Sequence, residues 1–385
     1  MFFRILLLLV IFAITTNRGG RLLLALFALQ LGAQPLAVGF LAATFAVFPA
    51  VLSWPIGMVV DRFGARWLLA AACACQIAGP LLPFLFPGLP AIFAGAALIG
   101  LSTAFQNVPM HNLIGLLSKP DERTVNYGYY SQMLSIGGFA GPVLVGFGVD
   151  YAGHGSACVY LALLALVPMA AMVVWGHVLP GGTRDAGTPG GNILHTLKDR
   201  NMLRILATGS LVVGGLEFFQ FYMPVYGHGI GLSASATGIV LGSSAAASFA
   251  IRMIMRVVLT RLTEVQLLAY SFYLAAASLA LVPFFQTVVP LAILAFIYGL
   301  GMGCGQPITM MLTFGNSAKG RSGEILGVRI AVNQGTRVIV PVLFGSIGSA
   351  FGLLPVFWLF ALMLGSGGLL SGNQKSDGRG ESKSG

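Results

Sequence analysis

Five charged side chains stand well inside apolar stretches of this sequence. They are Arg18, Arg21, Glu217, Arg252 and Arg337. A charge at the centre of a bilayer costs about 2.5–3.5 kcal/mol on insertion scales, so such a residue is a functional candidate by default. Four arginines and one glutamate leave an excess of three positive charges (4 − 1 = 3). Because a planar guanidinium binds carboxylate or phosphate through paired hydrogen bonds, these residues predict a site for a small organic anion.

Glu217 is the one carboxylate placed deep in an apolar stretch, which makes it the candidate group for proton coupling. Burial favours the protonated form of a carboxylate, whereas a nearby arginine favours the charged form. Glu217 and Gln220 are three residues apart, as are Arg18 and Arg21, so each pair projects from one side of a helix. If Arg18 approaches Glu217 in one state and leaves it in another, proton affinity alternates with access. A purely structural bridge between Arg18 and Glu217 is the alternative.

Neutral polar residues complete the predicted substrate site. Arg329, Asn333 and Arg337 follow one another at intervals of four residues, in one stripe of a helix. The predicted substrate-binding residues are Arg18, Arg21, Asn107, Gln220, Arg252, Gln306, Asn333 and Arg337. Asn107 and Gln306 have the alternative role of joining helices through hydrogen bonds. Arg329 has the alternative of extending along its apolar stem to the membrane surface.

The elements that position these residues are long apolar stretches. The chain has 385 residues, of which 57% are hydrophobic and 8% charged, against about 25% charged in soluble domains. Its mean hydropathy is +0.88. Stretches of about 20 residues, long enough to cross a bilayer, lie near 5–29, 36–58, 67–87, 90–115, 126–149, 156–178, 203–227, 234–258, 265–287, 289–313, 324–347 and 353–371. The sequence therefore predicts an all-α integral membrane protein with twelve transmembrane helices.

The net charge of +10 indicates topology and not a nucleic-acid partner. The predicted turns at 30–35, 88–89, 150–155, 228–233, 288 and 348–352 contain no Lys or Arg. Because basic residues are retained on the cytoplasmic side, both termini are predicted in the cytoplasm, with the protein in a bacterial inner membrane. The first stretch lacks the features of a signal peptide. The four cysteines lie in apolar stretches without metal-site spacing, so neither metal nor cofactor is expected.

The chain repeats itself at a constant offset between its two halves. Pro341 and Gly345 fall on Pro142 and Gly146 (341 − 142 = 345 − 146 = 199). Further pairs aligned by the same offset are Gly238 with Gly39, Gly299 with Gly100 and Gly352 with Gly153. A proline and a glycine at the same depth of the fifth and eleventh stretches indicate two related halves.

The repeat predicts two six-helix bundles, at 1–178 and 203–372. A cytoplasmic linker at 179–202 joins them, and its Gly, Pro and Thr residues indicate flexibility. Residues 373–385 are Gly, Ser and charge, which predicts a disordered cytoplasmic tail.

A charged loop joins the second and third stretches. Residues 57–69 read Gly-Met-Val-Val-Asp-Arg-Phe-Gly-Ala-Arg-Trp-Leu-Leu. This G-x-x-x-D-R-x-G-x-R pattern resembles the signature loop of the major facilitator superfamily of secondary transporters. The resemblance covers residues 3–372 and implies a monomer without enzymatic activity, whose halves rock around a substrate site at the midplane. It also implies a conformational latch for the outward-facing state, here named the latch loop, formed by Gly57, Asp61, Arg62, Gly64 and Arg66.

A second motif lies in the fifth stretch and is echoed in the eleventh. Residues 137–146 resemble the G-x-x-x-G-P segment of drug–proton antiporters. Its glycines and proline predict a bent helix that slides against its partner between the halves. The residues of this sliding motif are Gly137, Gly141, Pro142, Gly146, Pro341 and Gly345.

The antiporter resemblance implies an alternative function, a proton-driven multidrug or metabolite exporter. Such a protein is expected to have more acidic and fewer basic groups in its cavity. A non-transporting sensor on the same fold is a further alternative. The sequence lacks the G-x-x-x-x-G-K-[ST] signature of ATP-driven pumps.

Overall fold

The computed structural model describes residues 2–117, 123–178, 200–315 and 322–372, so the predicted tail and nearly all of the linker lie outside the described residues. Every regular element in these ranges is helical. The long helices are α1 (Phe2–Gln30), α2 (Pro35–Phe63), α3 (Arg66–Leu85), α4 (Leu89–Leu117), α5 (Arg123–Trp175), α7 (Arg200–Gly229), α8 (Ala234–Val258), α9 (Glu264–Leu281), α10 (Val288–Gly315), α11 (Ser322–Phe351) and α12 (Leu353–Gly372). Two short 3₁₀ helices, η1 (Gly176–Val178) and η2 (Val282–Phe284), follow α5 and α9.

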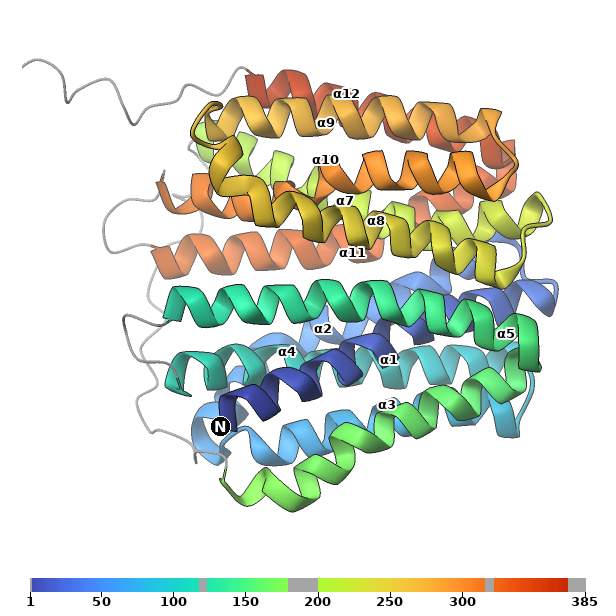
Figure 1. Ribbon diagram of the computed structural model, residues 1–385, viewed down its shortest axis with the longest axis vertical. Helices are drawn as coiled ribbons and strands as arrows, with labels where there is room; N and C mark the ends of the chain where they lie inside the picture. The colour runs from blue at the N-terminus through green and yellow to red at the C-terminus, as the bar shows by residue number, and fades with distance from the viewer. Residues whose placement is uncertain (1, 118–122, 179–199, 316–321, 373–385) are drawn as a thin grey trace, which may run out of the picture.

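Eleven of these helices are long and apolar enough to cross a membrane. One of them, α5, has 53 residues and is broken at Gly153, whose φ of 78° and ψ of 168° are not helical. Figure 1 shows the chain reversing direction there, so α5 makes two passes. The twelve predicted helical passes and the all-α class are confirmed. The gap expected between residues 149 and 156 is wrong, because a single glycine is enough to turn the chain.

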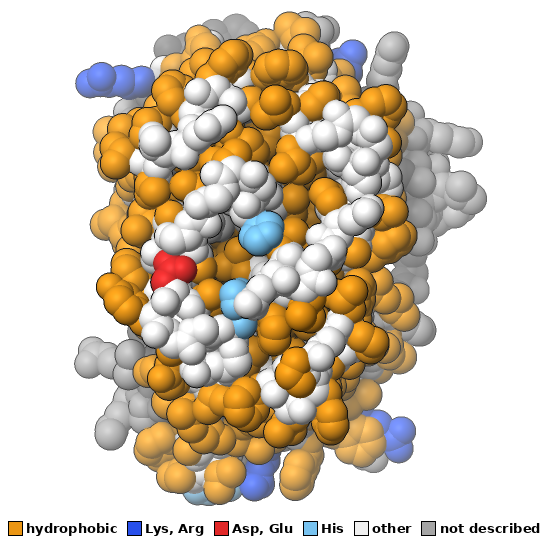
Figure 2. All heavy atoms as spheres, turned by 90° about the vertical axis from the view of Figure 1, so that its right-hand side faces the viewer, with side chains coloured by type: hydrophobic (Ala, Val, Ile, Leu, Met, Phe, Trp, Pro, Cys, Tyr) orange, Lys and Arg blue, Asp and Glu red, His pale blue; other side chains and the backbone are white. Residues whose placement is uncertain are grey.

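Glycines with positive φ make the turns at one end of the bundle, here named the turn end. They are Gly32, Gly153, Gly231 and Gly352, with φ between 77° and 85°. The repeat offset relates the first to the third and the second to the fourth (231 − 32 = 352 − 153), so the repeat extends to the turn geometry. The opposite end, here named the terminal end, holds the starts of α1 and α7. Figure 2 looks onto the turn end, where hydrophobic side chains dominate, histidine side chains lie near the centre and acidic side-chain atoms lie to their left.

The helices before the linker (the first half) meet those after it (the second half) along two seams, α5 against α8 and α2 against α11. A Cβ added to Gly39 would lie 2.6 Å from the carbonyl oxygen of Pro341, and one added to Gly238 would overlap that of Pro142. Only glycine allows such close backbone approach. Residues 141–150 and 340–349 also have the same succession of buried and exposed side chains. The two seams are therefore structurally equivalent.

Both seams are tight near the turn end and loosen toward the terminal end. Residues 251–258 of α8 and 330–339 of α11 include no fully buried side chain. The other end of α8 is buried at Ala234, Thr237 and Gly238. The halves therefore touch at the turn end and diverge at the terminal end.

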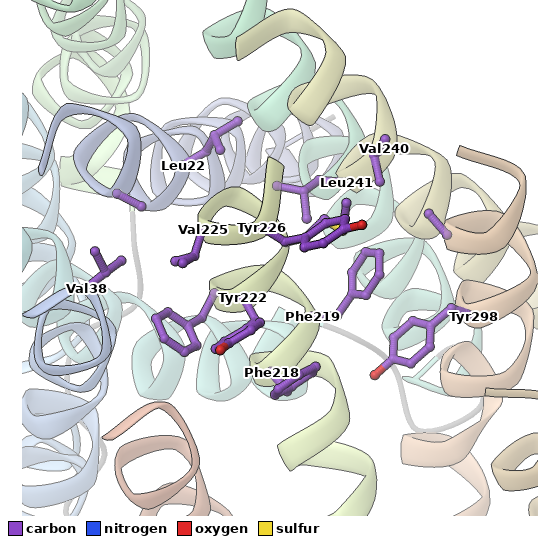
Figure 3. Close-up of a cluster of buried hydrophobic side chains, with 14 of the residues drawn as sticks. Leu22, Val38, Phe218, Phe219, Tyr222, Val225, Tyr226, Val240, Leu241 and Tyr298 are labelled. Carbon is purple, nitrogen blue, oxygen red and sulfur yellow. The ribbon is translucent and has the colours of Figure 1, made fainter. Parts of the chain in front are cut away.

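Aromatic side chains fix the rotation of α7 (Figure 3). Phe218 stacks on Phe360 of α12 with centroids 4.3 Å apart, and Phe219 stacks on Tyr298 of α10 at 4.6 Å. The Tyr298 hydroxyl donates a hydrogen bond to the carbonyl oxygen of Gly215 at 2.7 Å. With these faces of α7 occupied by aromatic contacts, the remaining face carries Glu217 toward α1.

Candidate functional site

An ionic cluster lies where α1, α7 and α11 meet. The Nη1 atom of Arg21 lies 2.9 Å from Oε2 of Glu217, and Nε of Arg337 lies 3.6 Å from Oε1 of the same carboxylate. The side chains of Arg21, Glu217 and Arg337 are 16%, 10% and 26% exposed. Because Arg21 belongs to the first half and the other two residues to the second, the cluster ties the halves together at their centre.

In the state described here Arg18 does not form an ion pair with Glu217. Arg18 donates through Nη1 to the side-chain oxygen of Gln220, while Glu217 pairs with Arg21. The repeat offset aligns Arg18 with Glu217 in sequence, but long side chains reach a full helical turn along the axis. Each arginine therefore pairs with the residue aligned with the other arginine: Arg18 with Gln220, and Arg21 with Glu217. Arg18 still interacts electrostatically with Glu217, as it does with Arg21, Arg252 and Arg337.

Two donors of the cluster lack a hydrogen bond, although one of them, the Nε of Arg337, lies 3.6 Å from the Glu217 carboxylate. The Nε atoms of Arg21 and Arg337 are buried and have no hydrogen-bond partner among the described residues. An unsatisfied buried donor carries a penalty of about 1–3 kcal/mol, and more when it is charged. The guanidinium of Arg21 also lies over the ring of Phe45, 5.4 Å from its centroid. The cluster therefore has donors that an added anion could satisfy.

Arg252 lies beside the cluster and spans the seam between α5 and α8. Its Nε donates to the carbonyl oxygen of Gly303 at 2.9 Å, and its Nη1 donates to the hydroxyl of Ser135 at 3.2 Å. Phe45 and Ser135 thus contact arginines of the site, although nothing in the sequence distinguishes one apolar and one small polar residue from their many neighbours.

Arg329 does not extend to the surface, so the alternative considered for it is wrong. Its side chain turns into the second half, where Nη2 donates to the Thr309 hydroxyl at 2.9 Å and to the Gln306 carbonyl oxygen at 3.3 Å. It is 7% exposed. Arg329 consequently joins α11 to α10.

The predicted neutral residues divide in two groups. Gln220 is engaged by Arg18, and Gln306 contributes its backbone oxygen to Arg329. Asn107 and Asn333 are half-buried, with no side-chain hydrogen bond to another described residue. The amides of Asn107 and Asn333 are available to a ligand, whereas the Gln306 contact involves only its backbone and leaves the role of its side chain a prediction.

The latch loop lies at the terminal end. Gly64 follows α2 with a φ of 81° and donates its N–H to the Val60 carbonyl oxygen at 2.8 Å. Arg62 and Arg66 are exposed and lie over the neighbouring aromatic rings at 5.1 Å and 5.2 Å. Nothing approaches Gly57 within 4 Å of an added Cβ. The side chain of Asp61 lies outside the described residues.

The sliding motif faces two different partners. Added Cβ atoms at Gly137 and Gly141 would meet Ile14 and the Thr15 carbonyl oxygen of α1, within the first half. Gly146 instead meets the Ala234 carbonyl oxygen at 2.5 Å across the seam. In the eleventh helix, Pro341 meets Gly39 and Gly345 meets Pro35, both in α2. The motif thus fixes α5 on α1 while allowing close contact between the halves.

Twelve membrane-length passes, arranged in two related halves around a charged centre, define a polytopic membrane transporter. The profile of the Major Facilitator Superfamily matches residues 6–341. The chain belongs to the major facilitator superfamily, as the latch loop predicted.

Relatives and solved structures agree with this family. The chain is similar to the efflux pump patC of Aspergillus clavatus, with 25% identity over 184 residues, or 48% of this chain and 33% of that protein. It is also similar to the MFS-type transporter patC of Penicillium expansum, with 27% identity over 150 residues, or 39% and 27% of the two chains. The match thus spans a third or less of each relative.

Among solved structures, the nucleoside transporter NupG has a TM-score of 0.76 with 14% identity, covering 96% of this chain and 98% of that one. A bacterial homologue of the human lysosomal transporter Spinster, in an inward-facing and occupied conformation, has a TM-score of 0.74 with 12% identity over 96% of both chains. These similarities show the fold.

Proposed function

We propose that this protein is a secondary active transporter of a small organic anion, coupled to protons and working by alternating access. The observation that carries the proposal is the pair of buried, unsatisfied Nε donors on Arg21 and Arg337, on either side of one carboxylate. Counting Arg18, Arg21, Arg252 and Arg337 against Glu217, the centre has an excess of three positive charges (4 − 1 = 3). A carboxylate or phosphate ligand would reduce that excess and satisfy the donors.

Proton coupling follows from competition for the same arginines. Ionised Glu217 holds Arg21 and Arg337 in the state described above. When Glu217 takes up a proton, its negative charge is lost and both guanidinium groups become free to bind an anionic substrate. The substrate then supplies the negative charge that Glu217 has given up. One proton and one anion therefore bind together, which predicts symport.

The two halves, at 1–178 and 203–372, are proposed to rock against each other as rigid bodies. The absence of Lys and Arg from the predicted turns supports an orientation with the turn end outside and both termini in the cytoplasm of a bacterial inner membrane. With the turn end closed, the state described here would then be inward-facing. The latch loop, at the other end, would engage only in the outward-facing state, consistent with the exposure of Arg62 and Arg66.

A proton-driven exporter remains the second candidate. The partial match to an efflux pump favours it, as does the glycine–proline segment at 137–146. The two candidates differ in the expected charge of the ligand, which is an anion for the first and a cationic drug for the exporter. The excess of arginine at the centre favours the anion and disfavours the cation.

A thermal-shift screen of the purified protein tests the choice. The ligands are small monocarboxylates, dicarboxylates, inorganic phosphate and cationic drugs. Anions should raise the melting temperature, and Arg337→Gln should weaken their binding by about 2–5 kcal/mol. Arg256→Gln, at the exposed end of α8, is the matched control and should bind like the wild type. Stabilisation by cations alone would favour the exporter and refute the anion site.

A further inference from the structure

Asp150 caps a helix of the opposite half. It stands on α5 just before the break at Gly153, and its two carboxylate oxygens accept hydrogen bonds from the backbone N–H groups of Ala234 at 2.9 Å and Ser235 at 2.8 Å. These are the first two residues of α8. Among the backbone N–H groups at the start of α8, the side chain of the helix's own cap, Ser233, accepts from that of Ala236. Asp150 therefore satisfies the two N–H groups that α8 leaves free at its start.

The other seam has the equivalent contact with one bond fewer. Ser349, which the repeat offset aligns with Asp150, accepts a hydrogen bond from the N–H of Leu36 in α2 at 2.9 Å. The first residue of α2 is Pro35, the equivalent of Ala234, and proline has no N–H to donate. In each seam the number of acceptor oxygens therefore equals the number of free N–H groups. The carboxylate of Asp150 faces two N–H groups in the α5–α8 seam, and the hydroxyl of Ser349 faces one in the α2–α11 seam.

We propose that Asp150 and Ser349 are the closing contacts of the turn end, with Asp150 the stronger of the two. The inference rests on the proposed alternating access. Both contacts join the halves, so both must break when the turn end opens. A carboxylate at a helix N-terminus gains from the helix dipole as well as from its hydrogen bonds, whereas a hydroxyl gains only the bond. Closure of the α5–α8 seam is therefore charge-assisted, and closure of the α2–α11 seam is neutral.

The glycine contacts of the seams cannot replace this role. They allow the backbones to approach, but they provide no directional bond that is lost on opening. Asp150 is a positioning residue in this scheme, because it acts on the halves and lies away from the ionic cluster. Its substitution should change the distribution of states without changing the affinity of either state for an anion.

The test measures the distance across the turn end with spin labels at Leu31 and Val289, which are exposed, in opposite halves and outside the seams. Asp150→Asn should increase the open-to-closed ratio by roughly 2- to 30-fold, the range expected for a charge at a helix N-terminus. Ser349→Ala should increase it by less. Binding of inorganic phosphate or a carboxylate is not needed for this readout, so it stays informative if the anion proposal fails.

A rescue variant separates capping from a general loss of structure. Ala234→Pro removes one donor while keeping a residue that is favoured at the first position of a helix. The preceding Ser233 has a ψ of 161°, which a following proline accepts. The double variant Asp150→Ser with Ala234→Pro copies the α2 seam.

The double variant should be more closed than Asp150→Ser alone, because the hydroxyl then meets a single donor. An unchanged distance distribution in Asp150→Asn would overturn the proposal. A double variant whose open-to-closed ratio shows the full combined effect of the two single substitutions would also overturn it. Melting temperatures of all variants identify any that fail to fold. If an Asp150 variant fails to fold, the distance distribution of Ser349→Ala is compared with that of the wild type instead, and an unchanged distribution there overturns the proposal.

Discussion

Replacing Glu217 by glutamine isolates the charge at the centre of the transporter. The amide keeps the size of the carboxylate and one acceptor oxygen, so Arg21 keeps a neutral hydrogen bond. What is lost is the negative charge between Arg21 and Arg337. The ionic cluster would then hold Arg21 and Arg337, with Arg18 and Arg252 beside it, and no carboxylate among the residues discussed above.

The structure sets the size of the effect. At an effective dielectric constant of about 20, charges separated by 2.9 Å and 3.6 Å attract by about 6 and 5 kcal/mol. Desolvation of the three groups opposes most of this gain, and breaking a buried pair typically costs about 3–5 kcal/mol. Because the three side chains keep 10–26% exposure, we expect Glu217→Gln to lower the free energy of unfolding by about 3 kcal/mol.

The functional consequence is a loss of proton dependence. In the wild type, anion affinity should rise as the pH falls, because protonation of Glu217 frees both arginines. In Glu217→Gln the affinity should be high and independent of pH, since the amide mimics the protonated acid. The variant should exchange substrate across liposome membranes but fail to accumulate it under a pH gradient.

Reversible unfolding in mixed detergent gives the stability change, and calorimetric titration at several pH values gives the affinity. Glu264→Gln, at the start of α9, is the control for loss of a carboxylate outside the cluster and should retain accumulation. If Glu217→Gln still accumulated substrate with only a pH gradient applied, Glu217 would not be the coupling group and would be a structural partner of Arg21.

Three further outcomes are expected. Gly238→Ala should open the turn end, because the added Cβ collides with the Pro142 carbonyl oxygen. Gly138→Ala, whose added Cβ has its nearest atom at 3.9 Å, is the control and should not open it. The spin-label distance across the turn end compares the two variants. Tyr222→Phe should raise the free energy of unfolding by about 1 kcal/mol, since the Tyr222 hydroxyl is buried without a partner among the described residues; detergent unfolding that shows a clear loss contradicts this. Asp61→Asn should reduce transport at normal expression by shifting the conformational equilibrium, and full transport in liposomes refutes the latch.

The membrane class, the number of passes and the family were predictable from sequence because each depends on local composition or on a short motif. Apolar stretches of sufficient length form helices in a bilayer wherever they occur, since the backbone must satisfy its own hydrogen bonds there. The constant offset of the repeat similarly predicted two related halves, and in the structure Gly39 and Gly238, like Pro341 and Pro142, occupy equivalent positions in the two seams.

Pairing within the cluster was decided by tertiary structure. An arginine side chain spans more than one helical turn, so equivalent depth did not reveal that Arg21, and not Arg18, binds Glu217. Arg329 is a second case, because only the packing of α10 against α11 shows a set of neutral acceptors facing it.

The capping of α8 by Asp150 also depends on the fold. In the sequence Asp150 is only an acidic residue near a turn. Its partners are backbone N–H groups, and the sequence cannot identify them because nearly every residue type has such a group. The sequence by itself determined which residues bear charge and how deep they lie, because composition and helical rise fix both. Only the tertiary structure decided which charges meet, because that depends on helix rotation and on the side chains of distant segments.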